Sequence, residues 1–313
     1  MAGLTPRAAL CIQAATAVCR GTAGSMAVFT NLRHRAEYLG FRVVAAIIGV
    51  LPLELASRWS GAGWRLIAPL LKRHQRALTN LAMAFPERSA SERQTIALAM
   101  WDNLGRTFAE FFHLDELTVG GRISLEQPER FEALRGIGSA VICSLHMGNW
   151  EIVAEAARFL GQRPAGVYQA LTNPLVDAMI NRKRAPLYPG GLFAKSPRTA
   201  MKLLHYAREG GWVAFLADQR EGRGVLAPFF GKPAPSTPFP AVIARSVGAP
   251  LYVARVKRLG GARFSIAVEE IEVPRSADRD ADVAQTTRLI QAAFERMVRE
   301  APEQWMWAHR RWD

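Results

Sequence analysis

The sequence predicts an α/β protein, in which a helical region precedes a sheet that carries helices on its faces. From Glu126 onward, short apolar runs of strand length alternate with helical patterns, which is typical of α/β sheets. Before that point, roughly from Leu53 to Leu117, the pattern is helical. With 313 residues, the chain is long enough to form one large α/β domain or two small ones.

The amino-acid composition indicates the cellular compartment of the protein and the classes of partner that it can bind. Hydrophobic residues make up 50% of the chain, which excludes a disordered protein. Three cysteines are too few for a disulfide framework, so we expect the main domain to be intracellular. The net charge of +13 predicts an acidic partner, which can be nucleic acid, an anionic membrane, a phosphorylated lipid or an acidic carrier protein. Charge alone does not choose among these.

Residues 1–37 are expected to form an N-terminal extension. The apolar stretch from Ala8 to Val18 has the character of a signal-peptide core, with Arg7 just before it. We favour a second interpretation, in which Met26 is the true start and the residues before it are not native. N-terminal mass spectrometry of the native protein tests this, and an intact Met1 or Ala2 terminus would contradict it.

Residues 38–56 are mostly apolar and predict a membrane-associating helix. A spanning helix needs about 20 apolar residues, a length that this segment barely reaches. Two arginines, Arg33 and Arg35, precede it in the positive-inside position. A core helix of the globular domain is the alternative, and three residues disfavour spanning: Arg42, Pro52 and Glu54. Proline is expected to end this helix or to start the next one.

Residues 57–313 are expected to form the main domain, with a helical N-terminal part. Ser89 and Glu92 have the spacing of a helix start. The candidate strands are Ala140–Leu145, Ala165–Ala170, Trp212–Ala217, Pro250–Val256 and Arg263–Val268. Helices are expected between the first three, at Glu151–Leu160, Pro174–Arg184 and Arg198–Arg208. Glycines and prolines from Gly222 to Pro240 predict a long loop.

The stretch from Ala140 to Glu155 carries the chemistry. A buried strand breaks at His146 and a helical pattern follows, which places the loop side chains at the ligand-binding edge of an α/β sheet. Gly148 permits the bend and Asn149 is a plausible N-cap. Residues five apart do not face each other on one helix. His146 and Glu151 can therefore meet only if the histidine lies in the loop and the glutamate in the first helical turn.

In that arrangement, the carboxylate of Glu151 orients one imidazole nitrogen of His146 and leaves the other free to act as a base. The pair would supply two members of a catalytic triad, the base and the group that orients it, but no protein nucleophile. The nucleophile would then be a hydroxyl of the substrate. A lone histidine at a strand end is more often a satisfied structural residue. The neighbouring residues decide between these interpretations.

The sequence from His146 to Glu151 resembles the His-x4-Asp/Glu motif of glycerolipid-type acyltransferases. Its glutamate, with Gly-Asn-Trp between, resembles the late acyltransferases of lipid A biosynthesis, the lauroyl and myristoyl transferases. The stretches Asn80–Glu87 and Pro302–Trp312 extend the resemblance, which spans roughly Phe41 to Asp313. It implies a three-layer α/β/α acyltransferase-type sheet over residues 57–313.

The same resemblance indicates a substrate-binding set formed by Arg184, Asp218, Asn149 and Arg220. Arginine suits a phosphate or a developing oxyanion, because its planar fork donates two hydrogen bonds at once. Asp218 follows the strand Val213–Ala217, and its carboxylate is expected to hold Arg184 or another cation at the sheet edge. The alternative for Arg184 is a basic residue at a helix end that complements the helix dipole. The alternative for Asp218 is an ordinary loop residue that caps a turn.

Two features of the C-terminal half compete with this assignment or extend it. His309, in the C-terminal signature, competes with His146 as the catalytic histidine. We prefer His146, because only it has a glutamate at the right spacing.

The stretch Phe229–Lys232 is expected to line an acyl groove. Three tryptophans are expected to pack the domain or to meet the bilayer interface: Trp305, Trp307 and Trp312.

The resemblance implies transfer of a fatty acyl chain from acyl carrier protein to a hydroxyl of a lipid A precursor, without an acyl-enzyme and without a cofactor. The implied partners are the carrier protein, a phosphorylated glycolipid acceptor and the inner membrane, with the catalytic domain on its cytoplasmic side. One alternative is a related enzyme that acylates another membrane lipid, such as a glycolipid or an amino-acid lipid. Another is a non-catalytic basic protein that binds membranes or nucleic acid, although no nucleic-acid fold signature is present. No metal site is expected, because the six histidines are scattered and no His-Glu-x-x-His occurs.

Overall fold

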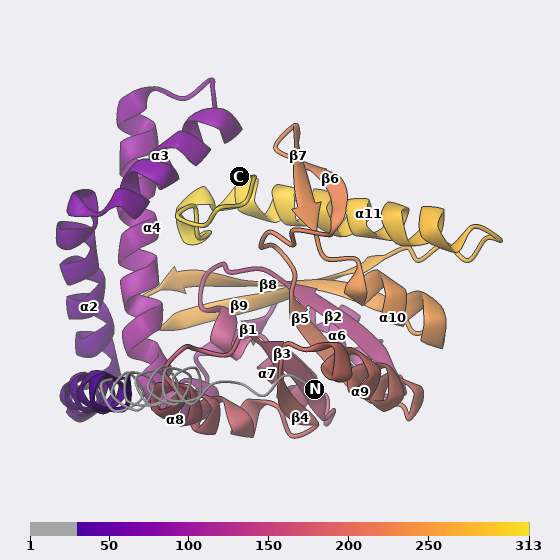
Figure 1. Ribbon diagram of the computed structural model, residues 1–313, viewed down its shortest axis with the longest axis horizontal. Helices are drawn as coiled ribbons and strands as arrows, with labels where there is room; N and C mark the ends of the chain where they lie inside the picture. The colour runs from indigo at the N-terminus through magenta and orange to yellow at the C-terminus, as the bar shows by residue number, and fades with distance from the viewer. Residues whose placement is uncertain (1–29, 313) are drawn as a thin grey trace, which may run out of the picture.

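The computed structural model describes residues 30–312 (Figure 1). The proposed start at Met26 lies outside these residues. Residues 30–50 form one helix, called the N-terminal helix below, so the expected boundary at residue 37 is not a boundary of secondary structure. Within residues 30–312, no helix combines the length and apolar character needed to cross a membrane.

The expectation of one helix over residues 38–56 was wrong. The N-terminal helix ends at Val50, and α2 (Leu53–Ile67) begins after Pro52. Pro52 has an extended backbone, with φ −54° and ψ 138°. Proline lacks an N–H and its ring disfavours a helical conformation in the residue before it, so the chain turns here and a new helix starts.

The helical region expected from Leu53 to Leu117 is present and begins with α2. It continues through η1 (Ala68–Leu70), α3 (Lys72–Ala84), α4 (Ala90–Glu110), η2 (Phe111–His113) and α5 (Leu114–Val119). Ser89 and Glu92 form the expected capping box at the start of α4: the serine side chain accepts from the Glu92 N–H, and the glutamate accepts from the Ser89 N–H. Long α4 reaches from α3 to the sheet, as Figure 1 shows.

The sheet is seven-stranded and mostly parallel. Its strands, in spatial order, are β1 (Ile123–Leu125), β9 (Arg263–Ile271), β8 (Leu251–Gly260), β2 (Ala140–Ser144), β5 (Trp212–Leu216), β3 (Pro164–Tyr168) and β4 (Gly191–Ala194). The five strands from β8 to β4 run parallel, β9 is antiparallel to β8, and β1 is parallel to β9. The carboxyl ends of β2, β5, β3 and β4 therefore share one edge.

Alternation along β2 separates two apolar cores. Val141 and Cys143 join one core with α9 (Pro197–Arg208), α10 (Phe239–Val247) and α11 (Arg279–Glu300). Ile142 joins the other, with α6 (Pro128–Glu132) and α7 (Glu155–Phe159). Successive side chains of a strand point to opposite faces of the sheet, so these two cores lie on opposite faces. The predicted α/β class, with helices on both faces of the sheet, is confirmed.

All five expected strands are present, and α8 has the predicted bounds, Pro174–Arg184. The expected helix at Glu151–Leu160 is instead split into η3 (Trp150–Ile152) and the short α7. The expected loop from Gly222 to Pro240 contains a hairpin, β6 (Val225–Phe229) and β7 (Lys232–Ser236). The prolines of this segment argued against strands, because proline in a sheet is confined to edge strands and bulges. Both strands of a two-stranded hairpin are edge strands, so they can contain proline.

Candidate active site

His146 and Asp218 lie opposite each other because of the strand register. Ser144, the last residue of β2, pairs with Leu216, the last residue of β5. The residues two positions beyond each strand end are His146 and Asp218. The imidazole Nδ1 of His146 lies 2.8 Å from Oδ1 of Asp218, and the His146 backbone N–H donates to Oδ2 at 2.9 Å.

Asp218 is buried, and a third donor holds it. The indole N–H of Trp305 donates to Oδ2 at 2.8 Å. Burial alone would raise the pKa of Asp218, but the charge of His146 and the hydrogen bonds from His146 and Trp305 lower it from 3.8 to about 2. An ionised carboxylate only accepts, so Nδ1 of His146 carries the hydrogen of their bond. In the neutral form of this imidazole, Nε2 is therefore the nitrogen that can take a proton.

The carboxylate of Glu151 does not meet His146, contrary to the sequence-based expectation. Both of its oxygens accept from Arg184, at 2.7 Å from Nε and 2.5 Å from a terminal nitrogen. The reason is the 3₁₀ turn at residues 150–152, which directs Glu151 toward the last turn of α8. The two carboxylates have therefore exchanged the roles that the sequence suggested: Asp218 orients His146, and Glu151 holds Arg184.

Arg184 is a fixed cation beside this pair. Burial would lower the pKa of its guanidinium, but the charge and hydrogen bonds of Glu151 outweigh burial and raise the pKa, so the group stays charged. The guanidinium also lies 5.5 Å from the ring centroid of Phe111. A planar cation held by a bidentate carboxylate has little freedom, which suits the recognition of an anion in a defined orientation.

Trp150 connects the two pairs. Its indole N–H donates to Glu151 at 3.2 Å, and its ring lies against the His146 ring with centroids 5.3 Å apart. The loop between them needs glycine: Gly148 has φ +58°, and a Cβ there would lie 2.1 Å from the carbonyl oxygen of Val256. The backbone conformation and the close approach to β8 both exclude other residues.

Comparison with known proteins identifies the family. The model of the family described as bacterial lipid A biosynthesis acyltransferase matches residues 26–313. This chain belongs to that family.

Curated relatives agree with this. The chain is 27% identical over 292 residues to a lipid A biosynthesis lauroyltransferase of Escherichia coli (strain K12), which covers 89% of this chain and 92% of the relative. It is 30% identical over 156 residues, 47% of this chain and 46% of the relative, to the lipid A biosynthesis myristoyltransferase of the same strain. A lipid A biosynthesis acyltransferase of Haemophilus influenzae is 24% identical over 277 residues, 83% of this chain and 82% of the relative. The protein is an acyltransferase.

Asn149 of the acyltransferase has an internal role in the structure. It is fully buried, its side chain accepts from the Glu151 N–H at 3.2 Å as the expected N-cap, and its amide donates to Glu110 at 2.9 Å. The oxygen and the nitrogen of the Asn149 side-chain amide therefore each have a partner within the protein. The structure places Asn149 as a support of the loop and not where it would touch substrate. Arg220 is exposed, and within residues 30–312 it makes no ion pair.

Glu110, on α4, is a functional residue that sequence reasoning missed. It is completely buried and accepts from Ser57 at 2.7 Å, from Asn149, and from Arg258 through two guanidinium nitrogens, one at 2.9 Å. A glutamate between Phe108 and Phe111, in an apolar part of a helix, was the available signal, because a charge at such a position needs a buried partner.

The C-terminal signature of the acyltransferase supports the same loop. Residues 147 and 305 form an isolated antiparallel bridge, the Gly148 N–H donates to Gln304 at 3.1 Å, and the Met306 N–H donates to the His146 carbonyl at 3.2 Å. Trp305 and Trp307 are buried, which agrees with the expectation that they pack the domain, and Trp305 also donates to Asp218. Phe229 is buried against Trp305.

His309 is less suited than His146 to act as the base. Burial lowers the pKa of its imidazole, and the nearby charge of His146 lowers it further, whereas Asp218 raises it. Its Nδ1 is buried and has no hydrogen-bond partner among residues 30–312. The imidazole of His146 has an orienting carboxylate, and the side-chain amide nitrogen of Gln219 lies 3.2 Å from its Nε2. The described residues hold no cluster of potential ligands for a metal ion.

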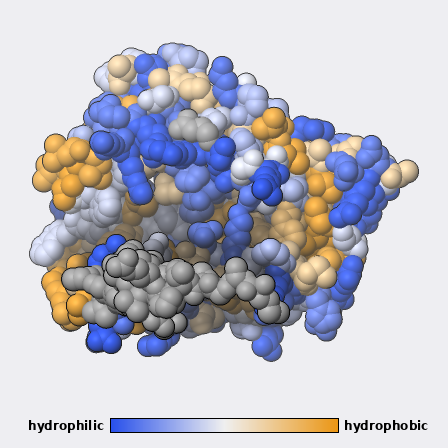
Figure 2. All heavy atoms as spheres, viewed as in Figure 1, coloured by the Kyte–Doolittle hydropathy of each residue, from blue (hydrophilic) through white to orange (hydrophobic). Residues whose placement is uncertain are grey.

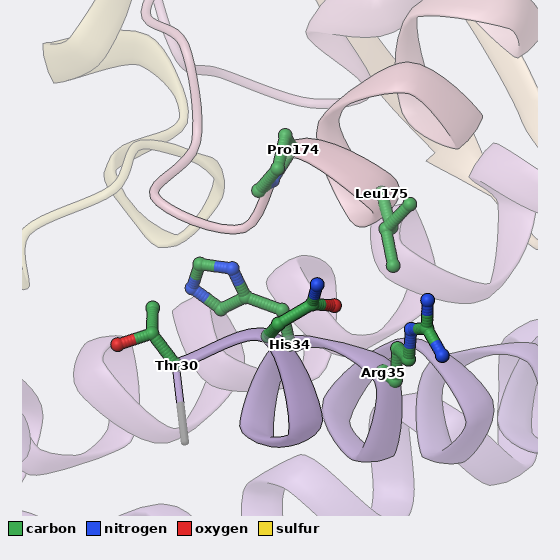
Figure 3. A pocket seen from close by; sticks show the side chains of 6 residues that line it. Thr30, His34, Arg35, Pro174 and Leu175 are labelled. Carbon is green, nitrogen blue, oxygen red and sulfur yellow. The ribbon is translucent and has the colours of Figure 1, made fainter. Parts of the chain in front are cut away.

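The structure contains two hollows near these elements. Figure 3 shows an open pocket of about 500 Å³ between the N-terminal helix and the start of α8, lined by Thr30, Asn31, His34, Arg35, Pro174 and Leu175. Its lining includes none of the active-site residues above. A small apolar void of about 20 Å³ lies between β2, β5 and α7, with walls that include Ile142, Val153, Ala157 and Ala214. It borders the segment that follows Glu151 and has room for about one methyl group.

Proposed function

We propose that this acyltransferase moves a fatty acyl chain from the thioester of acyl carrier protein to a hydroxyl of a lipid A precursor, with His146 as the general base. The observation that carries the proposal is the hydrogen bond between Nδ1 of His146 and the ionised Asp218, which leaves Nε2 at the sheet edge with its lone pair. The His146 side chain is 16% exposed, so it is accessible but shielded.

In the proposed reaction, Nε2 of His146 removes the proton of the acceptor hydroxyl as that oxygen attacks the thioester carbonyl carbon. The tetrahedral intermediate collapses, the carbon–sulfur bond breaks, and the imidazolium returns its proton to the leaving thiolate. The products are an ester and a free carrier thiol. General base catalysis of this kind contributes about 10²–10⁴-fold, and the buried Asp218 stabilises the imidazolium that forms.

The residues beside the base support direct transfer rather than an acyl-enzyme. Cys143 lies within β2, and burial raises the pKa of its thiol well above the usual range, so it is not a thiolate at neutral pH. The Ser144 hydroxyl is buried as well. The attacking oxygen is therefore assigned to the substrate, as the motif suggested.

Arg184 is proposed to bind a negative charge during the reaction, either the oxyanion of the intermediate or a phosphate of the acceptor. Glu151 then acts as a positioning residue that fixes the guanidinium, through the two hydrogen bonds described above. Stabilisation of an oxyanion by one fixed donor is worth about 10²–10³-fold. This assignment replaces the expected role of Glu151 as the partner of His146.

The partners remain those implied by the resemblance. The net charge of +13 suits an acidic carrier protein and a phosphorylated glycolipid. The relatives are named for lipid A biosynthesis, with lauroyl and myristoyl groups as their acyl chains. We propose an inner-membrane location with the active site on the cytoplasmic side, supported by exposed apolar residues on the N-terminal helix: Val43, Ile47 and Val50.

The test is acyl transfer by the purified protein from acylated carrier protein to a lipid A precursor, followed by mass spectrometry of the lipid. His146→Ala is expected to lower the rate at least about 10²-fold, since the general base is lost. His205→Ala, at an exposed histidine on α9, is the matched control and should retain the wild-type rate. Transfer at the wild-type rate by the His146 variant would refute the proposal, and a product only with another lipid would correct the acceptor.

A further inference from the structure

The outer face of α2 and η1 is apolar and open to solvent. Trp59, Leu66 and Leu70 expose 59%, 79% and 85% of their surface, and Ala62, also exposed, falls between the first two. Spacings of three, four and four residues place these side chains on one side of the helix. Figure 2 shows hydrophobic side chains gathered at the edge of the molecule where Figure 1 draws the end of α2 that leads to α3.

The opposite face of α2 is locked onto α4, so the helix cannot rotate to bury this stripe. A Cβ on Gly61 would lie 2.8 Å from the Asp102 side chain, and a Cβ on Gly105 would lie 2.6 Å from the Ser60 carbonyl oxygen. Such close approach between two helices leaves no room to turn. The inward tryptophan of α2, Trp64, stacks on Trp101 of α4 with centroids 5.7 Å apart.

Cations flank the apolar stripe. Arg58 and Arg65 lie on α2, and Lys72 and Arg73 follow at the start of α3; all four are exposed. Within residues 30–312, none of them forms an ion pair with a carboxylate. An apolar stripe with a tryptophan and a border of unpaired basic residues is the pattern of a helix that lies in a membrane interface.

We propose that this face, made of Trp59, Ala62, Leu66 and Leu70 with the four flanking cations, binds the surface of an anionic bilayer. A second copy of the chain is a poorer occupant, because a two-fold interface would bring the same cations together, and Glu54, the one carboxylate of α2, is already paired with Arg122. The inference goes beyond the proposed function, since it is carried by α2 and η1 and would hold for any lipid acceptor. It is also separate from the N-terminal helix.

The test is co-sedimentation of the full chain with vesicles of phosphatidylcholine and phosphatidylglycerol. Burial of a large apolar side chain changes a partition coefficient by about tenfold or more, so Leu66→Gln combined with Leu70→Gln is expected to reduce vesicle binding at least about tenfold. The matched control is Met201→Gln on α9, which is 67% exposed and lies outside this face. Binding by the double variant within twofold of wild type would overturn the proposal.

Two further readouts separate the possible occupants. Arg58→Gln with Arg65→Gln should remove the preference for vesicles that contain phosphatidylglycerol over pure phosphatidylcholine. Brominated acyl chains should quench wild-type fluorescence more than that of Trp59→Phe. A dimer in solution that the leucine substitutions dissociate, with vesicle binding unchanged, would instead identify a second copy as the occupant. Transfer to a detergent-dispersed acceptor should be unchanged in the leucine double variant, so this proposal and the proposed function can fail separately.

Discussion

At the scale of single residues, the decisive finding is which carboxylate holds the histidine. Nδ1 of His146 lies 2.8 Å from the carboxylate of Asp218, and the carboxylate of Glu151 is paired with Arg184. The structure uses a partner 72 residues away, because β2 and β5 are neighbours and end in register. Glu151 lies in the 3₁₀ turn at residues 150–152, and its carboxylate points toward Arg184. Local spacing could not predict strand order, and strand order selects Asp218.

The depressed pKa of Asp218 predicts a specific dependence of stability on pH. An acid with a lowered pKa in the folded state stabilises that state above its unfolded pKa of 3.8, and the contribution is lost as the pH falls toward about 2. We expect the difference in free energy of unfolding between wild type and Asp218→Asn to shrink by about 2 kcal/mol over this window. Chemical denaturation at a series of pH values measures it.

The matched control for that series is Asp115→Asn, at a side chain that is 86% exposed. The difference between this variant and wild type should stay flat over the same range of pH. If the Asp218 variant also gives a flat difference, the carboxylate is not held by His146 and Trp305 in the folded protein.

At the scale of elements, α4 is the support of the catalytic loop. Its Asn103 and Thr107 side chains donate to the Gly148 carbonyl at 3.0 and 2.9 Å, and its Glu110 holds Asn149 and Arg258. The loop that follows His146 is therefore held by hydrogen bonds from α4 on one side and by hydrogen bonds with the C-terminal segment on the other. The helix itself could be predicted from its capping residues, whereas its contacts with the loop depend on tertiary packing that no local pattern encodes.

This arrangement predicts that Glu110→Gln is costly although it touches no substrate. Removing one partner of a buried ion pair leaves an uncompensated charge, here that of Arg258, and costs about 3–5 kcal/mol. Thermal and chemical denaturation measure the loss of stability. The control is Glu132→Gln, which breaks the exposed pair with Arg135 and should not change stability measurably. Equal stability of the two variants would contradict a supporting role for Glu110.

At the scale of the whole molecule, the α/β class and the shared strand edge could be predicted, because both follow from apolar periodicity and from the order of strands and helices. The sequence placed His146 and Asp218 at one edge but could not show that β5 lies directly beside β2. It placed a membrane-associating helix over residues 38–56, and the break that it expected at Pro52 divides this range between two helices. Hydropathy alone could not show which apolar residues of α2 are exposed, because exposure depends on how α2 packs on α4.

The described part of the molecule therefore has its reactive side chains at one sheet edge and most of its exposed large apolar residues on the N-terminal helix, α2 and η1. The first of these depends on the assignment of His146 and Asp218 as base and orienting carboxylate, whereas the proposal for the α2 face can fail or hold separately.

The pH dependence of acyl transfer in Asp218→Asn and in Glu151→Gln tests that assignment most directly. Loss of Asp218 removes the anion that stabilises the imidazolium, so the ionisation that limits kcat/KM at low pH should move to lower pH while the rate falls. Loss of Glu151 should lower the rate through Arg184 and leave that ionisation in place. An ionisation that moves in the Glu151 variant and stays fixed in the Asp218 variant would contradict the account.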